Sequence, residues 1–403
     1  MMKPIIFAVL LMVTLLSACA PGQNFDARLS PVVGQYRFSI AGWEWQTLFQ
    51  QAKQLLPGQQ VQTDGGVSDV TQYFDAVKRI KTLQSEIAAA NAKNDSGTST
   101  RLSDELRTSQ EKQTTRAATV ETIIRGQIRA TLAGEGIYNP VGKGKVGFPP
   151  LIFKLEVLPS VLVISPRDRI ESMRELVLKQ NLALPQKESI EAGVDKLGVS
   201  SLVVGVGGMG TYPSLVDGES SLQATIETAA HEWLHQYLAF TPLGFRYILD
   251  LTGVSRNYDI ATMNESLAGM FGKEIGARVY EKYYLEYEDG TKQAPSSATG
   301  FDFNLEMREI RKAVDVYLAR GEIEQAEAFM EQQRQALASK GYYIRKLNQA
   351  YFAFHGTYAD SPAFLSPIGV ELKELRTKSA SLNEFLNTAA GMTSRQDLTQ
   401  SLR

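Results

Sequence analysis

The segment at 219–240 constrains the fold most, because it joins a helical apolar pattern to two of the chain's three histidines. Its apolar residues recur at helical spacing, and Ser220 and Ser221 are suitable N-caps, so a helix with a mostly buried face is predicted. On such a helix His231 and His235 lie one turn apart, and their imidazoles can reach one ion together. Burying two histidines beside a glutamate is costly unless something binds them.

Chance is the alternative explanation of this His-Glu-x-x-His motif, which about one chain in a hundred of this length contains at ordinary residue frequencies. One histidine would then be packed, and the other would cap a helix or face solvent. The desolvation cost favours a metal site, and two histidines on one rigid helix suit tetrahedral zinc. Glu232 is rotated by about 100° from His231, so it can face a water molecule at the metal and act as general base.

A catalytic zinc site needs a third protein ligand and an open fourth position. The remaining histidine, His355, is 120 residues beyond His235, which makes a carboxylate the more suitable third ligand. Glu265 offers one, inside the stretch 261–280, where apolar residues again recur at helical spacing. Alanines and glycines in that stretch allow close packing. Glu265 is therefore expected on a second helix that packs against the first.

The motif His-Glu-Trp-Leu-His at 231–235, followed by Asn264 and Glu265, resembles the gluzincin class of zinc metallopeptidases, the thermolysin-like and aminopeptidase-like group. The resemblance covers about 201–280. It implies Zn²⁺ as the cofactor, with the two histidines and Glu265 as ligands and Glu232 as the residue that activates water. It also implies an edge strand that pairs with the backbone of a peptide substrate, formed by Gly207, Gly208, Met209 and Gly210.

One position departs from the thermolysin-like pattern. Those enzymes carry an aspartate four residues after the glutamate ligand, where it orients a zinc-binding histidine, but Gly269 occupies that position here. Another group must then orient the histidine. Glu227, one turn before His231, is a candidate, although it could equally serve as a cap or a solvated charge. Glu274 is rejected as a ligand, because it is nine residues past Glu265 and points to roughly the opposite side of the helix.

His355 and Tyr358 lie in an aromatic stretch of the C-terminal region. An imidazole or a phenol there could donate a hydrogen bond to the oxyanion that forms when water attacks a peptide carbonyl, and gluzincins use such donors. The alternative is a histidine packed among aromatic rings and satisfied by the backbone. Both residues are retained as catalytic candidates.

The N-terminus, 1–18, is typical of a secretory signal peptide: Lys3 precedes an apolar run and small residues that end at Cys19, the only cysteine. This order resembles the lipobox of bacterial lipoproteins, which implies that Cys19 carries the lipid and tethers the mature chain to the membrane. Ala20 after the cysteine favours the outer membrane or the cell surface, if the source has two membranes. A plain signal peptide with a chance cysteine is the alternative.

Composition divides the rest of the chain into four parts. An aromatic N-terminal segment, 19–66, precedes a polar part, 67–134, that is rich in Ala, Glu, Gln, Lys and Arg. With its polar break at 94–97, this part is predicted to form a long antiparallel helical hairpin, either a solvated spacer or a surface for a protein partner. A zincin-like catalytic domain is expected at 148–290, and a helical C-terminal domain at 301–403.

Local patterns within the catalytic part predict its elements. Two short strands are expected in 148–165, a helix from about Asp168 to Gln180, a second helix at 187–198, and a strand at the start of 201–216. The predicted fold class is α+β and mostly helical. Its zincin-like core would hold a small sheet, with the helical hairpin as an insertion.

The near-neutral charge limits the partners. With 42 Lys+Arg against 44 Asp+Glu, the formal net charge is −2, and no basic surface favours nucleic acid. The expected function is that of an exported, lipid-anchored, zinc-dependent peptidase. Similarity of the lipoprotein start and the helical C-terminal part to a group of predicted bacterial aminopeptidases favours an aminopeptidase. Two alternatives stay open: a non-catalytic zinc-binding envelope lipoprotein that acts as a scaffold, and amide hydrolysis on a cell-wall peptide.

Overall fold

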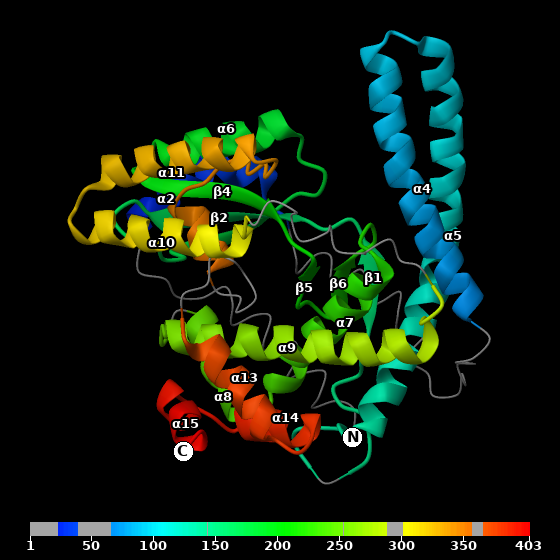
Figure 1. Cartoon of the computed structure of the whole chain (residues 1–403), viewed down its shortest axis with the longest axis vertical. Helices are drawn as coiled ribbons and strands as arrows, with labels where there is room; N and C mark the ends of the chain where they lie inside the picture. Colours follow the sequence, from blue (N-terminus) through cyan, green and yellow to red (C-terminus); the bar gives the residue numbers. More distant parts are fainter. Residues whose placement is uncertain (1–22, 39–65, 143, 253, 288–300, 357–365) are drawn as a thin grey trace.

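A computed structural model of the chain describes residues 23–38, 66–142, 144–252, 254–287, 301–356 and 366–403 (Figure 1). The signal peptide, Cys19 and Tyr358 lie outside these residues, so the predictions made for them stay predictions. Most described residues are helical and two small sheets accompany them, which confirms the α+β, mostly helical class. Within the described ranges, no helix has the length and apolar character required to span a bilayer.

The bounds of the elements are as follows. The helices are α2 (Gln23–Val33), the 3-10 turn η1 (Gly34–Tyr36), α4 (Val67–Ala92), α5 (Ser96–Gly134), α6 (Leu184–Asp195), α7 (Leu222–Leu238), α8 (Pro242–Leu251), α9 (Tyr258–Tyr283), α10 (Phe303–Ala319), α11 (Ile323–Ser339), α12 (Gln349–His355), α13 (Ile368–Lys378), α14 (Leu382–Ala390) and α15 (Arg395–Ser401). The strands are β1 (Phe153–Glu156), β2 (Ser160–Pro166), β3 (Arg174–Leu178), β4 (Val199–Gly205), β5 (Gly208–Met209) and β6 (Ser214–Asp217).

The first sheet is antiparallel, with the order β3-β2-β4. Its central strand β2 is a continuous apolar run because both faces are covered. Leu162 and Ile164 pack with α2 and α6 on one face, whereas Val161 and Val163 pack with Ala350 of α12 on the other. The sheet is thus the middle layer between two groups of helices (Figure 1).

The helix predicted from about Asp168 is wrong, because Arg174–Leu178 form strand β3 and pair with β2 over five residues. Arg, Glu and Leu favour helices, but only by less than about 1 kcal/mol per residue. Leu176 and Leu178, two residues apart on one face of the strand, enter the cluster with α2 and α6. Pairing with β2 and burial of that face decide the structure. The helix and the strand predicted to follow are confirmed as α6 and β4.

The second sheet has the order β1-β6-β5, with β1 parallel and β5 antiparallel to β6. The two strands predicted at 148–165 are therefore present as β1 and β2, but they belong to different sheets. Phe153 and Leu155 pack in the main core with α5, α7 and α9. The indole Nε1 of Trp233 donates a hydrogen bond to the carbonyl of Pro149 at 2.9 Å, which links α7 to the segment before β1.

Helices α7 and α9 meet at glycine positions. A Cβ atom at Gly272 would lie 2.6 Å from the carbonyl oxygen of Glu227 and 3.1 Å from the Cβ of His231. A Cβ atom at Gly276 would lie 2.4 Å from the Cγ of Glu227. Real side chains do not approach so closely, so the backbones can come this near only because these positions are glycine. The close packing predicted from the small residues of α9 is confirmed.

The predicted helical hairpin is confirmed as α4 and α5, which stand beside the body of the molecule with the turn far from it (Figure 1). Asn94 takes a positive φ of 55° in the turn, and Asp95 caps α5 by accepting from the amide of Thr98. At the base, Glu121 of α5 accepts hydrogen bonds from Lys154 Nζ (2.9 Å) and from the amide of Leu155 (3.0 Å) on β1. The base of the hairpin is thus built into the core.

The helices after residue 301 divide between two cores. Helices α10, α11 and α12 share an apolar cluster that includes Met307, Met330 and Phe352, whereas α13, α14 and α15 join the core of α7 and α9. Two carboxylates link these helices to the rest: Glu327 of α11 with Arg167, and Glu274 of α9 with Arg376 of α13.

Candidate metal centre

Helix α7 carries the two histidines on a face that the core leaves free. Ser221 begins the helix as its N-cap by accepting from the amide of Ala224 at 3.2 Å, as the sequence predicts. The opposite face is buried with α9 and the second sheet, through Leu222, Ile226, Ala229, Ala230, Trp233, Leu234, Tyr237 and Leu238. His231 and His235 are only partly buried, with side chains 17% and 16% exposed.

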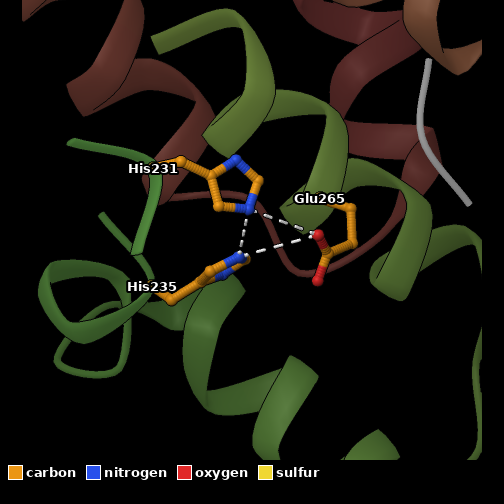
Figure 2. Close-up of side chains that lie close together, drawn as sticks. All are labelled: His231, His235 and Glu265. Atoms are coloured by element: carbon orange, nitrogen blue, oxygen red, sulfur yellow. Dashed lines mark hydrogen bonds and ion pairs between the residues drawn. The ribbon is translucent and has the colours of Figure 1, made fainter. Parts of the chain in front are cut away.

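His231, His235 and Glu265 converge across the contact between α7 and α9, and Figure 2 shows both imidazoles turned toward the carboxylate. The two Nε2 atoms are 3.0 Å apart. Glu265 Oε2 lies 3.7 Å from Nε2 of His231 and 3.6 Å from Nε2 of His235. One ligand atom from each residue lies within 4.8 Å of the others, so this group could hold a metal ion.

Two neighbouring residues orient the group. Nδ1 of His235 lies 2.7 Å from Oδ1 of Asn264, and because a carbonyl oxygen only accepts, Nδ1 carries a proton and Nε2 is the nitrogen that faces the cluster. The hydroxyl of Tyr247 on α8 donates to Oε1 of Glu265 at 2.6 Å. Its ring also stacks on His235, with centroids 5.9 Å apart. Asn264 therefore orients His235, and Tyr247 orients Glu265.

The sequence carried a signal for one of these two partners, Asn264, and none for the other. Asn264 stands directly before Glu265 on α9, so its amide lies close to any site that Glu265 joins. Tyr247 lies on α8, twelve residues after His235, and nothing in its local pattern indicates a contact with Glu265. Only the packing of α8 against α7 and α9 reveals that contact.

The charges of the group are strongly coupled. Burial alone would lower the pKa of His235, but the carboxylate of Glu265, with Glu232 and Asn264, raises that pKa to about 9. Burial would raise the pKa of Glu265, but the two histidines hold it well below its usual range. Without a bound cation, the group therefore keeps a proton on an imidazole beside a carboxylate.

The donor set fits a divalent cation. Two imidazole nitrogens 3.0 Å apart cannot both direct lone pairs at each other without something positive between or beside them. A carboxylate at the third corner and the oriented tautomer of His235 complete a set of two nitrogens and one oxygen. A cation can satisfy all three donors at once, whereas a single proton satisfies only part of the set.

Glu232 is the most enclosed carboxylate beside this group, with 7% of its surface exposed. Burial is the main cause that raises the pKa of its carboxyl, and the neighbouring histidines act against it. Its oxygens lie directly below strand β5: a Cβ atom at Gly208 would come within 2.4 Å of Oε1, and one at Gly210 within 3.4 Å of Oε2. Because residue 208 is a glycine, the carboxylate of Glu232 can occupy this space.

The segment Gly207–Gly210 lies at the edge of the second sheet, and the resemblance implies that it pairs with substrate. Gly208 and Met209 form the two-residue strand β5, which pairs with β6 on one side only among the described residues. Met209 also packs against the cluster of β2, β4 and α12. An edge strand with a free side can accept an extended peptide, so the geometry is compatible with that prediction.

His355 is the last residue of α12, where its ring contacts Tyr351 and Phe354 with centroids 4.3 and 5.1 Å away. Burial lowers the pKa of its imidazole, which keeps it neutral at pH 7. The hydroxyl of Tyr258, at the start of α9, donates to the carbonyl of Gly356 at 3.0 Å, so the end of α12 is tied to the helix of Glu265. No contact of His355 with the metal group is present within the described residues.

Glu227 and Glu274, two other acidic residues near the site in sequence, have partners in the fold. Glu227 accepts a hydrogen bond from Gln223 at 2.8 Å on its own helix. Glu274 forms ion pairs with Arg376 and Arg278, and its pKa is lowered chiefly by the hydrogen bond from Arg376. Nothing lies within 4 Å of a Cβ atom placed at Gly269, so that position faces open space.

Comparison of the chain with known proteins gives no match: no family, no curated protein and no solved structure is similar to it at a significant level. The geometry of His231, His235, Glu265 and Glu232, together with the resemblance of their motif, is what bears on the function of this chain.

Proposed function

We propose that this chain is a zinc-dependent peptidase of the gluzincin type. The observation that carries the proposal is the position of Glu232, a buried carboxylate with a raised pKa, beside a three-residue group that could hold a metal ion. A purely structural metal site has no use for such a carboxylate and is usually closed by a fourth protein ligand. Among the described residues the group has three candidate protein ligands and no fourth.

Zinc is the cation that suits this donor set best. Two imidazoles and one carboxylate occur together at catalytic zinc sites, whereas magnesium and calcium prefer oxygen ligands alone. A zinc ion held there would polarise a peptide carbonyl and make a nearby water molecule more acidic.

The chain's own groups supply the remaining steps. Glu232 takes a proton from the attacking water, because its raised pKa brings it nearer to neutral pH than an ordinary glutamate. The same carboxyl then gives the proton to the leaving amine. Strand β5 pairs with the extended backbone of the peptide through its free edge, which aligns the scissile bond above Glu232.

A donor to the developing oxyanion is part of the proposal. Neutral His355 can donate from one ring nitrogen, and Tyr358 lies three residues further. The same proposal includes export and lipid attachment at Cys19, with the globular part tethered to the cell envelope.

Two measurements test the proposal on the protein truncated after Cys19. Metal analysis should find about one zinc per chain, and Glu265→Ala should lose it because the third ligand is gone. Glu232→Gln should keep the zinc but lose hydrolysis of a mixed peptide pool by at least about 100-fold, since only the proton acceptor is removed. Zinc that is indifferent to Glu265, or full turnover without Glu232, would contradict the assignment.

A further inference from the structure

The loop between α5 and β1 presents two valines to solvent on a backbone that hydrogen bonds hold in shape. Asn139 accepts from the amide of Val141 at 3.2 Å and donates to the carbonyl of Val146 at 3.3 Å. The amide of Phe148 closes the loop by donating to the carbonyl of Tyr138 at 2.8 Å. Val141 is 69% exposed and Val146 is 73% exposed. The hydrogen bonds of one asparagine thus hold the loop so that both valines lie outside the core.

Two phenylalanines beside this loop extend its apolar surface. The ring of Phe148 packs against that of Phe240, with centroids 4.9 Å apart. Phe240 and Phe245 flank the start of α8 at the two positions that share one side of a helix start, and they are 39% and 57% exposed. Single exposed apolar residues are common, whereas a group of neighbouring ones marks an interaction site. This group, called the apolar patch below, consists of Val141, Val146, Phe148, Phe240 and Phe245.

The two segments that form the apolar patch carry only positive charge. Neither 136–149 nor 236–249 contains an aspartate or a glutamate. Lys145, next to one of the valines, and Arg246 on α8 are both exposed. Glu135, which precedes the loop, is already paired with an arginine of α9. Exposed apolar side chains with cations beside them match the acyl boundary and the anionic headgroups of a lipid bilayer.

The apolar patch lies on the side of α8 that faces away from the metal group. Tyr247, whose hydroxyl reaches Glu265, follows Phe245 by two residues, so the side chains of Tyr247 and Phe245 project about 200° apart. Figure 1 shows the segment that joins α5 to β1 at the end of the molecule opposite the turn of the hairpin. A bilayer under the apolar patch would therefore leave both the metal group and the hairpin turn accessible.

We propose that the apolar patch inserts into the headgroup region of an anionic bilayer, so that the chain rests on the membrane in one orientation. The valines and phenylalanines gain by leaving water, while Lys145 and Arg246 stay at the level of the headgroups. A second copy of the chain suits the patch less, because a symmetric contact would bring two positively charged rims together. Neither zinc nor Glu232 takes part, so failure of this proposal would leave the proposed function untouched.

Vesicle sedimentation tests the proposal on the protein truncated after Cys19, which carries no lipid. The protein should sediment with phosphatidylcholine vesicles that contain about a third phosphatidylglycerol, and binding should fall by at least about 10-fold on phosphatidylcholine alone. Val146→Asp should weaken binding to the mixed vesicles by about 10-fold, because it removes an inserted side chain and adds a negative charge. Lys145→Glu should weaken it by about 10-fold at low salt and by less at high salt.

Val316→Asp is the matched control, because Val316 is 49% exposed on α10, a helix that packs in a different apolar cluster. It should bind vesicles like the wild type, and all three variants should keep the wild-type melting temperature, since the changed side chains are exposed. A wild-type protein that stays in the supernatant, or loop variants that bind unchanged, would overturn the inference. So would a dimer in solution that Val146→Asp dissociates, because the apolar patch would then contact a second copy.

Discussion

The α4–α5 hairpin and the α7–α9 pair are both made of two long helices in contact, but they are held together in different ways. In the hairpin, large apolar side chains such as Ile80, Leu83 and Leu102 fill the space between the helices. In the α7–α9 pair, glycines at 272 and 276 remove side chains from the contact, and the backbones come close. The first arrangement separates the helix axes, and the second brings polar ligands from both helices within reach of one ion.

Because of this difference, the two helix pairs should respond differently to mutation. A contact filled by side chains can lose one of them and leave a cavity, which costs stability but moves little. Where two backbones touch at a glycine, there is no side chain that can move aside. An added methyl group must therefore displace one of the backbones. We therefore expect the hairpin to respond to mutation in stability and the α7–α9 pair to respond in metal binding as well.

The largest effect on stability is expected for Leu83→Ala in the hairpin. Leu83 is fully buried, and its truncation should destabilise the outer hairpin by about 2–5 kcal/mol. Hydrogen exchange of the α4 and α5 amides should become faster while zinc content stays at the wild-type level. Loss of zinc in this variant would mean that the two helix pairs are not independent.

Gly272→Ala should affect both properties. The new methyl group meets the carbonyl of Glu227 at 2.6 Å, so α9 must shift away from α7, at a cost of about 1–3 kcal/mol. The shift separates Glu265 from His231, and zinc affinity should fall by at least about 10-fold in a competition titration.

Gly269→Ala provides the matched control for that change on the same helix. Its methyl group meets nothing within 4 Å, so zinc affinity should not change and the protein should gain up to about 1 kcal/mol from helix propensity. Equal losses of zinc affinity in the two variants would show that helix distortion, not close approach, explains the result.

Tyr247→Phe tests how much one hydrogen bond, from Tyr247 to Glu265, contributes to metal binding. Removing the hydroxyl leaves Glu265 without the donor at 2.6 Å but keeps the ring that stacks on His235. Zinc affinity should fall by about 10-fold, with little change in melting temperature of the metal-free protein. A wild-type affinity would show that the orientation of Glu265 is set by packing alone.

The smallest effect is expected for Glu274→Gln, which tests how α9 is held on its other side. The hydrogen bond from Arg376 lowers the folded-state pKa of Glu274, so its stabilising contribution is present above the unfolded value and is lost as the pH falls through the folded value. The variant should be less stable than the wild type by under about 1 kcal/mol near pH 7. The difference should shrink between pH 5 and pH 3 in urea unfolding. A pH-independent difference would exclude the ion pair as its source.

Sequence alone predicted those parts of the molecule that local patterns determine. The hairpin follows from its composition and the break at 94–97, and the α7 helix follows from apolar spacing and the Ser221 cap. The proximity of His231 and His235 is a property of one helix, so it needed no tertiary information. Glu265 was found because its helix carries the same apolar spacing and small residues for close packing.

The parts that sequence did not predict depend on contacts between distant segments. Strand β3 has helix-favouring residues, and only its pairing with β2 makes it a strand. The contact of Tyr247 with Glu265 requires α8 to pack against α9. Such residues carry no periodic pattern of their own.

Helix α5 runs without interruption for 39 residues from the turn of the hairpin to the core. At 1.5 Å per residue it is a rod roughly 58 Å long. The part between the turn and Glu121 is about 25 residues, roughly 38 Å, so a tilt of 5° at Glu121 moves the tip by about 3 Å. Glu121 joins the same helix to β1 by its hydrogen bonds with Lys154 and the amide of Leu155. The hairpin is therefore attached at its base to the sheet that also contains β5.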